Sequence, residues 1–387
     1  MGIINRRHFS DLRGAMRLAV EATVGVTDVV EKMHHTIQLG HPPVGASRAT
    51  NASGLAGVVY RGIRGTTRLV GRGIDAGMAP LTSLIPEDES NAARDTLVSV
   101  INGLYGDHLL QTGNPLALEM IVRYAGQTVD PAEPGTLPAA TTGKLILFVH
   151  GLCLNDGHWV RDGHNHGESL ATDLGYTPLY LRYNTGLSIA DNGRNLAGIL
   201  ENLRCRWPVP VSELVIVGHS MGGLVARSAC HQGSLAGHDW LQHLRSLVFI
   251  GTPHHGAPLE RGGNWLDYAM NLSPYAAPFA RIVRKRSAGI IDLRYGSITD
   301  AMHDFVPLPS GVKCYAMAAM RGKKRGRVRE QLIGDGLVPL DSALGKSKVP
   351  SRCLDIPTSC QWVGLETGHN ELLGHPEVYA QLRDWLE

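Results

Sequence analysis

The chain has 387 residues, a formal net charge of +2, 19% charged residues and 43% hydrophobic residues. A charge balance so close to zero argues against a global nucleic-acid footprint. The hydrophobic share is enough to bury a core and excludes a disordered chain, and the length fits one large domain or two. Six cysteines in so long a chain do not form a disulfide scaffold, so we expect free thiols, although Cys353 and Cys360 could pair across a short loop.

The N-terminal end of the chain lacks the features of a targeting segment. An apolar signal-peptide core is interrupted by charged side chains at Arg6, Arg7, Asp11, Arg13 and Arg17. No stretch of about 18 residues is both apolar and free of charge, as a membrane-spanning helix requires. We therefore expect a cytoplasmic protein, with peripheral membrane contact left open.

Residues 1–140 are predicted to form a helical region packed on a catalytic domain that spans 141–387. Apolar residues recur at spacings of three and four, which is typical of helices, in residues 11–38, 54–85 and 91–111. Many glycines weaken the second of these helices, at about 1 kcal/mol each relative to alanine. A Pro/Gly/Thr-rich linker follows.

After this linker, short apolar runs alternate with helical patterns. The run at residues 144–149 predicts a strand buried on both faces, and further strands are expected at residues 178–182, 214–217, 247–250 and 312–317, with a last one near 360–365. Helical patterns lie at residues 189–203, 221–231 and 377–386. This alternation predicts an α/β fold, with a mostly parallel sheet covered by helices on both faces.

Ser220 is the candidate nucleophile. It is the serine of a G-x-S-x-G pattern that directly follows the apolar run LVIV and directly precedes a helical pattern. A strand–serine–helix turn places the hydroxyl on a sharp, strained corner, and the flanking glycines avoid collisions there. A serine hydroxyl needs a base within hydrogen-bond reach to act as a nucleophile at neutral pH.

Candidates for the base and the acid follow Ser220 in the order serine, acid, histidine. His369 lies between the last predicted strand and the last helix and is preferred over His375 as the base. Asp335, between two glycines, is preferred over Asp341 as the acid that orients the histidine. The acid is expected after the fifth predicted strand, at residues 312–317. Two further aspartates precede that strand and are expected in a helical insertion: Asp300 and Asp304.

Two backbone N–H groups are candidates for an oxyanion hole. Met221 directly follows the nucleophile at the start of a helix, where backbone N–H groups favour negative charge. Leu152 follows a His–Gly pair at the end of the first predicted strand, and Cys153 is the alternative donor there.

These motifs together resemble the α/β-hydrolase lipase/esterase superfamily. They are HGLCLND, LRYNTG, GHSMGGLVAR, FIGTPHHGAPLER, GDGLVPLDSALG and ETGHNELLGHPEVY, in this order. The sequence is similar to bacterial hydrolases that resemble the GPI inositol-deacylase catalytic domain and triacylglycerol lipases. The resemblance covers about residues 144–387 and implies an α/β-hydrolase fold with a lid insertion at about 256–310. It also implies a catalytic set of Ser220, Asp335 and His369, with Leu152 and Met221 as oxyanion donors.

Several other signals have a structural and a functional interpretation. His254 and His255 lie in the loop that in this superfamily shapes the acyl pocket, and His369 already fills the position of the base. The aromatic-rich segment 265–279 would suit an apolar acyl chain or ordinary lid packing. A metal site is disfavoured, because the spacing fits no tetrahedral motif at His158, His164 and His166.

Two groups of basic residues have contact with a membrane as one of their possible interpretations. The run from Arg321 to Arg329 is expected to be a solvated loop, with an anionic membrane or a phosphorylated substrate as the alternative and nucleic acid disfavoured. The arginines on one predicted helix face are expected to cover apolar surface of the catalytic domain, with a surface-lying amphipathic helix as the alternative: Arg61, Arg64, Arg68 and Arg72.

The sequence therefore predicts a serine carboxylic-ester hydrolase that acts on small-molecule or lipid acyl esters without a cofactor or metal. An acyltransferase or a thioesterase with the same three residues is the nearest alternative. A membrane- or protein-binding module on a hydrolase scaffold is the alternative from another class.

Overall fold

The computed structural model describes residues 6–38, 54–83, 92–138, 141–257, 272, 287–301, 304–322 and 334–387. Their contacts divide the chain into two units. The first unit comprises residues 1–89 and 109–117, and the second comprises residues 90–108 and 118–387.

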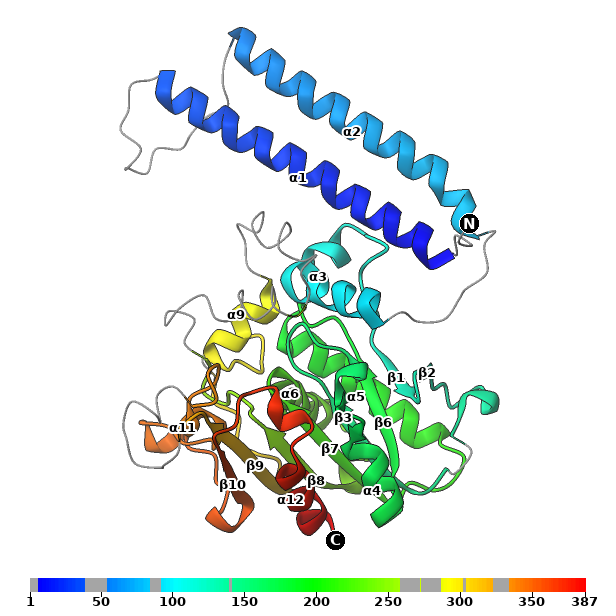
Figure 1. Ribbon diagram of the computed structural model, residues 1–387, viewed down its shortest axis with the longest axis vertical. Coiled ribbons are helices and arrows are strands. Elements are labelled where there is room, and N and C mark those ends of the chain that lie inside the picture. The colour runs from blue at the N-terminus through cyan, green and yellow to red at the C-terminus, as the bar shows by residue number, and fades with distance from the viewer. Residues whose placement is uncertain are drawn as a thin grey trace. The chain divides into compact units, whose positions relative to one another are not determined.

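The second unit is built on an eight-stranded sheet with the strand order β10-β9-β8-β7-β3-β6-β1-β2 (Figure 1). Its six central and C-terminal strands run parallel. They are β3 (Lys144–Val149), β6 (Thr177–Arg182), β7 (Glu213–His219), β8 (Leu244–Ile250), β9 (Lys313–Met320) and β10 (Gln361–Leu365). The antiparallel strands are β1 (Ile121–Tyr124) and β2 (Gln127–Thr128) at one edge, with a separate hairpin of β4 (Val160–Arg161) and β5 (His164–Asn165).

Helices cover both faces of this sheet (Figure 1). One face packs against the first part of α3 (Ala92–Gln111), α5 (Ile189–Arg206), α6 (Met221–Ala236) and α9 (Ala288–Tyr295). The other face packs against α4 (His166–Leu174) and α12 (Pro376–Leu386). Shorter helical turns connect these elements: η1 (Pro134–Thr136), η2 (Asp156–Trp159), η3 (Asp239–His243), α11 (Leu340–Ala343), η5 (Pro350–Arg352), η6 (Thr358–Cys360) and η7 (Glu371–Leu373).

The apolar runs that form β3, β6, β7, β8 and β9 are strands with both faces largely buried, whereas β10 lies at the edge of the sheet and is only partly buried. In β3, Ile146 and Phe148 point to the core on the α4 and α12 side, whereas Leu145 and Leu147 point to the core on the α5 and α6 side. Successive side chains of a strand alternate between faces, so a sheet covered on both sides needs apolar residues at every position. The predicted fold class is confirmed.

One part of the sheet was not predicted from the sequence. Residues 121–128 form β1 and β2, and β1 pairs antiparallel with β6 at a register of Val122 to Leu181. The segment is short, and Arg123 in its middle is charged, so it carries no clear strand pattern. Arg123 is nevertheless buried, because it forms an ion pair with Asp156 at 2.8 Å.

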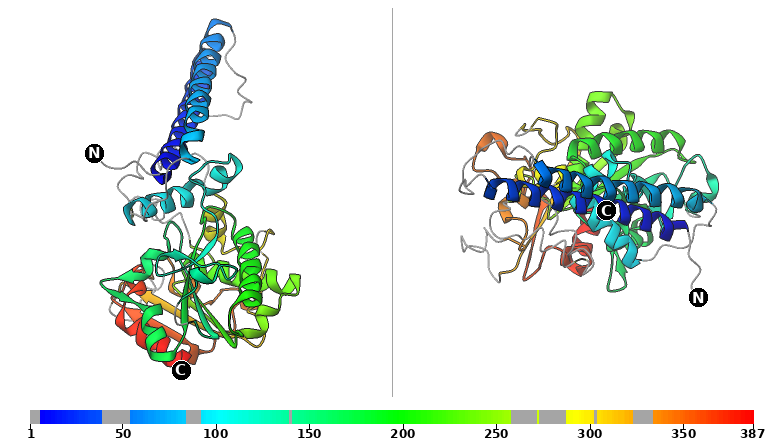
Figure 2. Two further views of the ribbon diagram at one scale, coloured as in Figure 1. Left: turned by 90° about the vertical axis from the view of Figure 1, so that its right-hand side faces the viewer. Right: turned by 90° about the horizontal axis from the view of Figure 1, so that it is seen from above.

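The first unit contains two long helices, α1 (Arg6–Gln38) and α2 (Gly54–Ser83), which lie side by side (Figures 1 and 2). They are antiparallel, because Arg64 pairs with Asp28 while Gly71 lies against Val20. Both predicted helices are confirmed at close to their expected bounds. None of the helices in the described ranges is apolar over a length that could cross a bilayer.

All six cysteines are free thiols, including Cys353 and Cys360. Whether residues 1–140 cover the catalytic domain stays a prediction.

Candidate active site

Ser220 occupies a sharp corner between β7 and α6. Its backbone angles, φ 53° and ψ −124°, are strained for a residue with a side chain, and its N–H donates to the Ile250 carbonyl at 2.8 Å. The neighbouring glycines are required by space. A Cβ at Gly222 would lie 2.1 Å from the Val149 carbonyl oxygen, and one at Gly218 would lie 2.5 Å from the Gly223 Cα. The G-x-S-x-G pattern therefore reflects the close packing of this corner.

Asp335 and His369 form a buried pair. The Asp335 Oδ2 atom lies 2.6 Å from His369 Nδ1, and the two side chains are 1% and 3% exposed. The other carboxylate oxygen accepts hydrogen bonds from the N–H groups of Leu337 at 3.0 Å and Val338 at 2.8 Å. This arrangement fixes the carboxylate and engages Nδ1 of the imidazole, so that Nε2 is the ring nitrogen that would take part in proton transfer.

The alternative candidates for the acid and the base lie outside the Asp335–His369 pair. Asp341 is an exposed residue in the first turn of α11. Asp300 forms an exposed ion pair with Arg194 at 2.7 Å. His375 caps the start of α12 by accepting the Glu377 N–H at 3.3 Å. Of these candidates, Asp335 is the one that contacts His369.

His219, which directly precedes Ser220, links the serine corner to the histidine loop. Its Nε2–H group donates to the His369 carbonyl at 3.2 Å, and the two imidazole rings are 4.7 Å apart. Burial lowers the pKa of His219 well below its usual value, so the ring is neutral at pH 7. Gly251 allows the same close approach, since a Cβ there would lie 3.1 Å from His369 Cε1. The Ser220 Oγ atom is buried and has no hydrogen-bond partner among the described residues.

The loop after β3 contains Leu152 and Cys153, the two alternatives for one N–H donor of the oxyanion hole. The Cys153 N–H donates to Thr185 Oγ1 at 3.2 Å and is therefore engaged. Within the described ranges, the Leu152 N–H has no protein acceptor. Met221 begins α6, and the N–H groups of a first helical turn have no acceptor inside the helix. The geometry thus favours Leu152 over Cys153.

Contacts that the sequence analysis did not foresee support this loop. Cys153 adopts a left-handed φ of 61° and packs against Gly103 of α3, where a Cβ would lie 2.3 Å from Cys153 Sγ. The Tyr183 hydroxyl donates to the His150 carbonyl at 2.8 Å. Burial raises the pKa of the Cys153 thiol to about 12, so it is protonated and no competing nucleophile at neutral pH. Tyr183 and Thr185 lie in the motif LRYNTG, which is the part of the sequence that could have pointed to these contacts.

A buried ion network anchors the end of the same loop. Asp156 begins η2 and accepts from Arg123 of β1 and from Arg182 of β6. Arg182 also contacts Asp95 of α3 at 2.9 Å. Three elements that precede or flank β3 are thereby tied to the loop that carries Leu152. Breaking such a buried pair by removing one partner is strongly destabilising, by about 3–5 kcal/mol.

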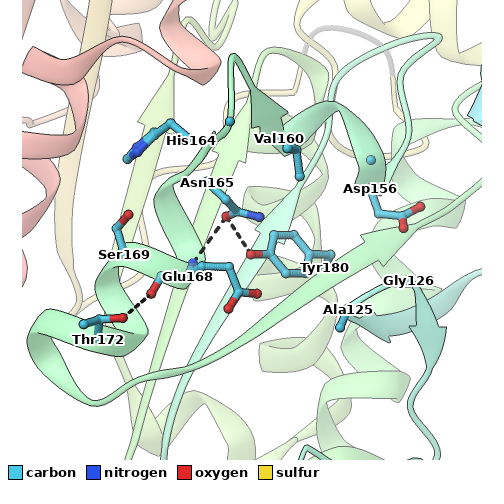
Figure 3. Close-up of a pocket in the computed structure, with 12 residues that line it drawn as sticks. Ala125, Gly126, Asp156, Val160, His164, Asn165, Glu168, Ser169, Thr172 and Tyr180 are labelled. Atoms are coloured by element: carbon cyan, nitrogen blue, oxygen red, sulfur yellow. Dashed lines mark hydrogen bonds between the residues drawn. The ribbon is translucent and has the colours of Figure 1, made fainter.

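A pocket of about 620 Å³ lies beside the β4–β5 hairpin and α4 (Figure 3), and its lining does not include Ser220, Asp335 or His369. Its wall includes Tyr180, whose hydroxyl donates to Asn165 Oδ1 at 2.7 Å, and His164. The histidine-rich segment is therefore spread over different roles. His158 stabilises the start of η2 through Asn155, whereas His164 contacts His166 at 2.9 Å. No cluster of three or more metal-ligating side chains is found among the described residues.

The remaining candidate residues fall into two groups. His254 is buried against Phe249, and His255 contacts the Gly345 carbonyl at 3.1 Å, so neither reaches His369 in the contacts recorded. The aromatic-rich segment 265–279, apart from Leu272, and residues 323–329 of the basic run lie outside the described residues.

Comparison with known proteins finds one family model and several similar solved structures. A family model described as a PGAP1-like alpha/beta domain matches residues 199–314, which include the Ser220 corner. No curated protein matches the chain. Among solved structures, the mature lipase BlEst2 from Bacillus licheniformis is similar at 21% identity and a TM-score of 0.41, over 69% of this chain and 98% of that one.

Two further solved structures are similar at lower identity. Aspergillus fumigatus lipase B has 13% identity and a TM-score of 0.40, over 65% of this chain and 55% of that one. The Pyrobaculum calidifontis esterase has 14% identity and a TM-score of 0.39, over 63% of this chain and 76% of that one. With its parallel sheet and the serine corner after β7, the chain has the α/β-hydrolase fold, and the expected resemblance is confirmed.

Proposed function

We propose that the protein is a serine carboxylic-ester hydrolase of the esterase or lipase type, with Ser220, His369 and Asp335 as its catalytic residues. The observation that carries the proposal is the buried contact of 2.6 Å between Asp335 and His369, on a loop that His219 links to the strained Ser220 corner. Asp335 and His369 meet although they lie 34 residues apart, and together with Ser220 they would supply the chemistry that an orienting acid, a base and a nucleophile require.

In the proposed reaction, Ser220 Oγ attacks the acyl carbonyl while His369 Nε2 accepts its proton. His369 then gives this proton to the departing alcohol as the carbon–oxygen bond of the ester breaks, which leaves an acyl-enzyme. Water attacks the acyl-enzyme, again with His369 as the base, and the carboxylic acid leaves with Ser220 restored. Asp335 holds His369 in the tautomer that carries its proton on Nδ1. Asp335 also stabilises the imidazolium that forms in each step.

The negative charge of the tetrahedral intermediate is proposed to rest on the N–H groups of Leu152 and Met221. Leu152 belongs to the loop braced by Thr185 and α3, whereas Met221 is fixed by the first turn of α6. Donors held in place before the reaction need no reorganisation when the charge develops, and the loss of one such donor costs about 10²–10³-fold in rate. The chemistry needs no cofactor or metal.

Labelling with a fluorophosphonate tests the nucleophile directly. The wild-type protein should gain the mass of the phosphonyl group on the peptide that contains Ser220, and Ser220→Ala should not react. An unlabelled Ser220 in a folded protein would contradict the proposal and favour a binding module on a hydrolase scaffold.

A series of p-nitrophenyl esters of increasing chain length then distinguishes a short-chain esterase from a lipase. The same assay with an added alcohol or thiol separates hydrolysis from acyl transfer. An acyltransferase would divert most of the acyl-enzyme to the added acceptor, whereas a hydrolase would release the acid. A thioesterase would instead prefer the matching acyl thioesters over the oxygen esters.

A further inference from the structure

The helix α2 has two different faces. One of them packs on α1: Gly57 and Arg64 are buried, and Gly71 lies against Val20. Arg64 is compatible with this interface because it pairs with Asp28 and the buried Glu31. The other face has no partner within this helix pair and exposes large aliphatic side chains, namely Val58, Val59, Ile63, Leu69 and Val70.

These aliphatic side chains form one continuous stripe. At 100° per residue they fall, together with the small residues Gly62 and Thr66, within a sector of about 140°. Leu69 is 72% exposed and Val58 is 57% exposed. From Val58 to Val70 the stripe extends about 18 Å along the helix axis.

Arginine side chains border the stripe along one side. Arg61, Arg68 and Arg72 are exposed and lie within about 40° of each other on the helix. No ion pair is recorded for any of the three within the described ranges. Residues 54–72 contain no aspartate or glutamate. The exposed side of α2 is therefore aliphatic and positively charged at once.

We propose that this face of α2 is a docking surface for an anionic lipid bilayer, on which the helix lies parallel to the membrane plane. Aliphatic side chains beside exposed arginines match the boundary between acyl chains and anionic head groups. The exposed stripe is purely aliphatic and contains neither tryptophan nor tyrosine, which are enriched among the residues that dominate protein–protein binding energies. The lipid surface is therefore a better match than a protein groove, and the helix is not apolar enough to span the bilayer.

Co-sedimentation of the full chain with vesicles tests this proposal. Vesicles of phosphatidylcholine with about one third phosphatidylglycerol should bind the protein, and added salt should weaken the binding. Vesicles of phosphatidylcholine alone should bind it much less. Absence of binding to the anionic vesicles would overturn the proposal.

Matched variants separate the docking surface from general surface effects. Leu69→Glu should lower vesicle binding at least tenfold, and the triple variant Arg61→Gln, Arg68→Gln, Arg72→Gln should lower it about 100-fold. Leu235→Glu on α6 alters a leucine with the same 72% exposure, and the triple variant Arg206→Gln, Lys346→Gln, Lys348→Gln removes the same charge from exposed sites. Both controls should bind as the wild type does.

The outcomes distinguish the lipid surface from a second copy of the chain. Equal losses in the controls would overturn the proposal. A lipid-independent dimer that Leu69→Glu dissociates, without vesicle binding by the wild type, would also overturn it and assign the face to self-association. The vesicle assay does not depend on catalysis, so Ser220→Ala should bind like the wild type.

Discussion

Ser220 combines two properties that a structural serine does not need together: a strained backbone and a buried hydroxyl without a hydrogen-bond partner among the described residues. Strain of this kind costs about 1–3 kcal/mol and persists where the surrounding structure fixes it. Here Val149, Ile250 and the flanking glycines fix it. The strain and the open hydroxyl are consistent with the proposed nucleophile.

Ser220→Ala should lower kcat by about 10⁶-fold, because the covalent step is lost, while the free energy of unfolding stays close to that of the wild type. The double variant with His369→Ala should lose little more activity than either single variant, since the residues act as a unit. Ester hydrolysis by purified, folded variants measures both effects. Multiplicative losses in the double variant would show that the two residues do not share one mechanism.

Asp335→Asn should cost about 10⁴-fold in kcat, because an amide would favour the wrong tautomer of His369. Asp341→Asn is the matched control. It changes an exposed aspartate six residues further along the same segment, and it should leave kcat within a few-fold of the wild type. Steady-state kinetics of the two variants, with melting temperatures to show equal folding, decide between them. The opposite ranking would assign the acid to Asp341.

At the scale of elements, α3 lies against the loop that carries Leu152. Gly103 packs on Cys153, and Gly106 packs on Asn184, whose neighbour Thr185 holds the Cys153 N–H. The ion network of Asp95, Arg182 and Asp156 ties the start of the same helix to η2. A helix that precedes the catalytic segment in the sequence thus positions one of the proposed oxyanion donors.

Gly103→Ala should displace the Leu152 loop, because the new Cβ would lie 2.3 Å from Cys153 Sγ and 3.2 Å from its backbone. We expect a loss of about 1–3 kcal/mol of stability from overpacking. A shift of the loop by about 1 Å would lower kcat by about 100-fold.

Gly198→Ala in α5 is the control, since a Cβ there meets nothing within 4 Å. It should be neutral or stabilise the protein by up to about 1 kcal/mol. Chemical denaturation and ester hydrolysis measure both variants. Equal behaviour of the two would show that α3 does not position the loop.

At the scale of the whole molecule, the sheet unit begins well before residue 140. Residues 90–108 and β1 belong to it, and Val100, Leu104 and Val122 are buried in its core. Each such side chain contributes about 1.5–3 kcal/mol by its burial. The strand β1 also covers the edge of β6, which would otherwise expose unpaired backbone groups.

A truncated chain that starts at Thr141 should therefore aggregate and lose ester hydrolysis, whereas one that starts at Ser90 should stay soluble and active. The first loses β1, the ion network and part of the core, and the second keeps them. Size-exclusion chromatography and ester hydrolysis of both chains check this. If the shorter chain is monodisperse, fully active and as heat-resistant as the whole chain, residues 90–140 are dispensable, and the expected covering role of residues 1–140 fails as well.

The sequence by itself determined the features that depend on local pattern. Apolar runs predicted the parallel strands β3, β6, β7, β8 and β9, because a strand buried on both faces needs an apolar residue at every position. The sixth parallel strand, β10, was expected near residues 360–365 and is a partly buried edge strand. Spacings of three and four predicted the helices α1, α2 and α3. The Ser220 corner was predicted because a strained turn between a strand and a helix imposes glycines at fixed offsets.

Only the tertiary structure decided the features that depend on contacts between distant residues. The flanking glycines favoured Asp335 over Asp341 in the sequence, but only the fold shows that the Asp335 carboxylate reaches His369, 34 residues away. Likewise, Arg123 of β1 can be buried because Asp156, 33 residues further along the chain, neutralises its charge. Burial of a charge or a polar group is favourable only when a partner arrives, and no local pattern records the partner.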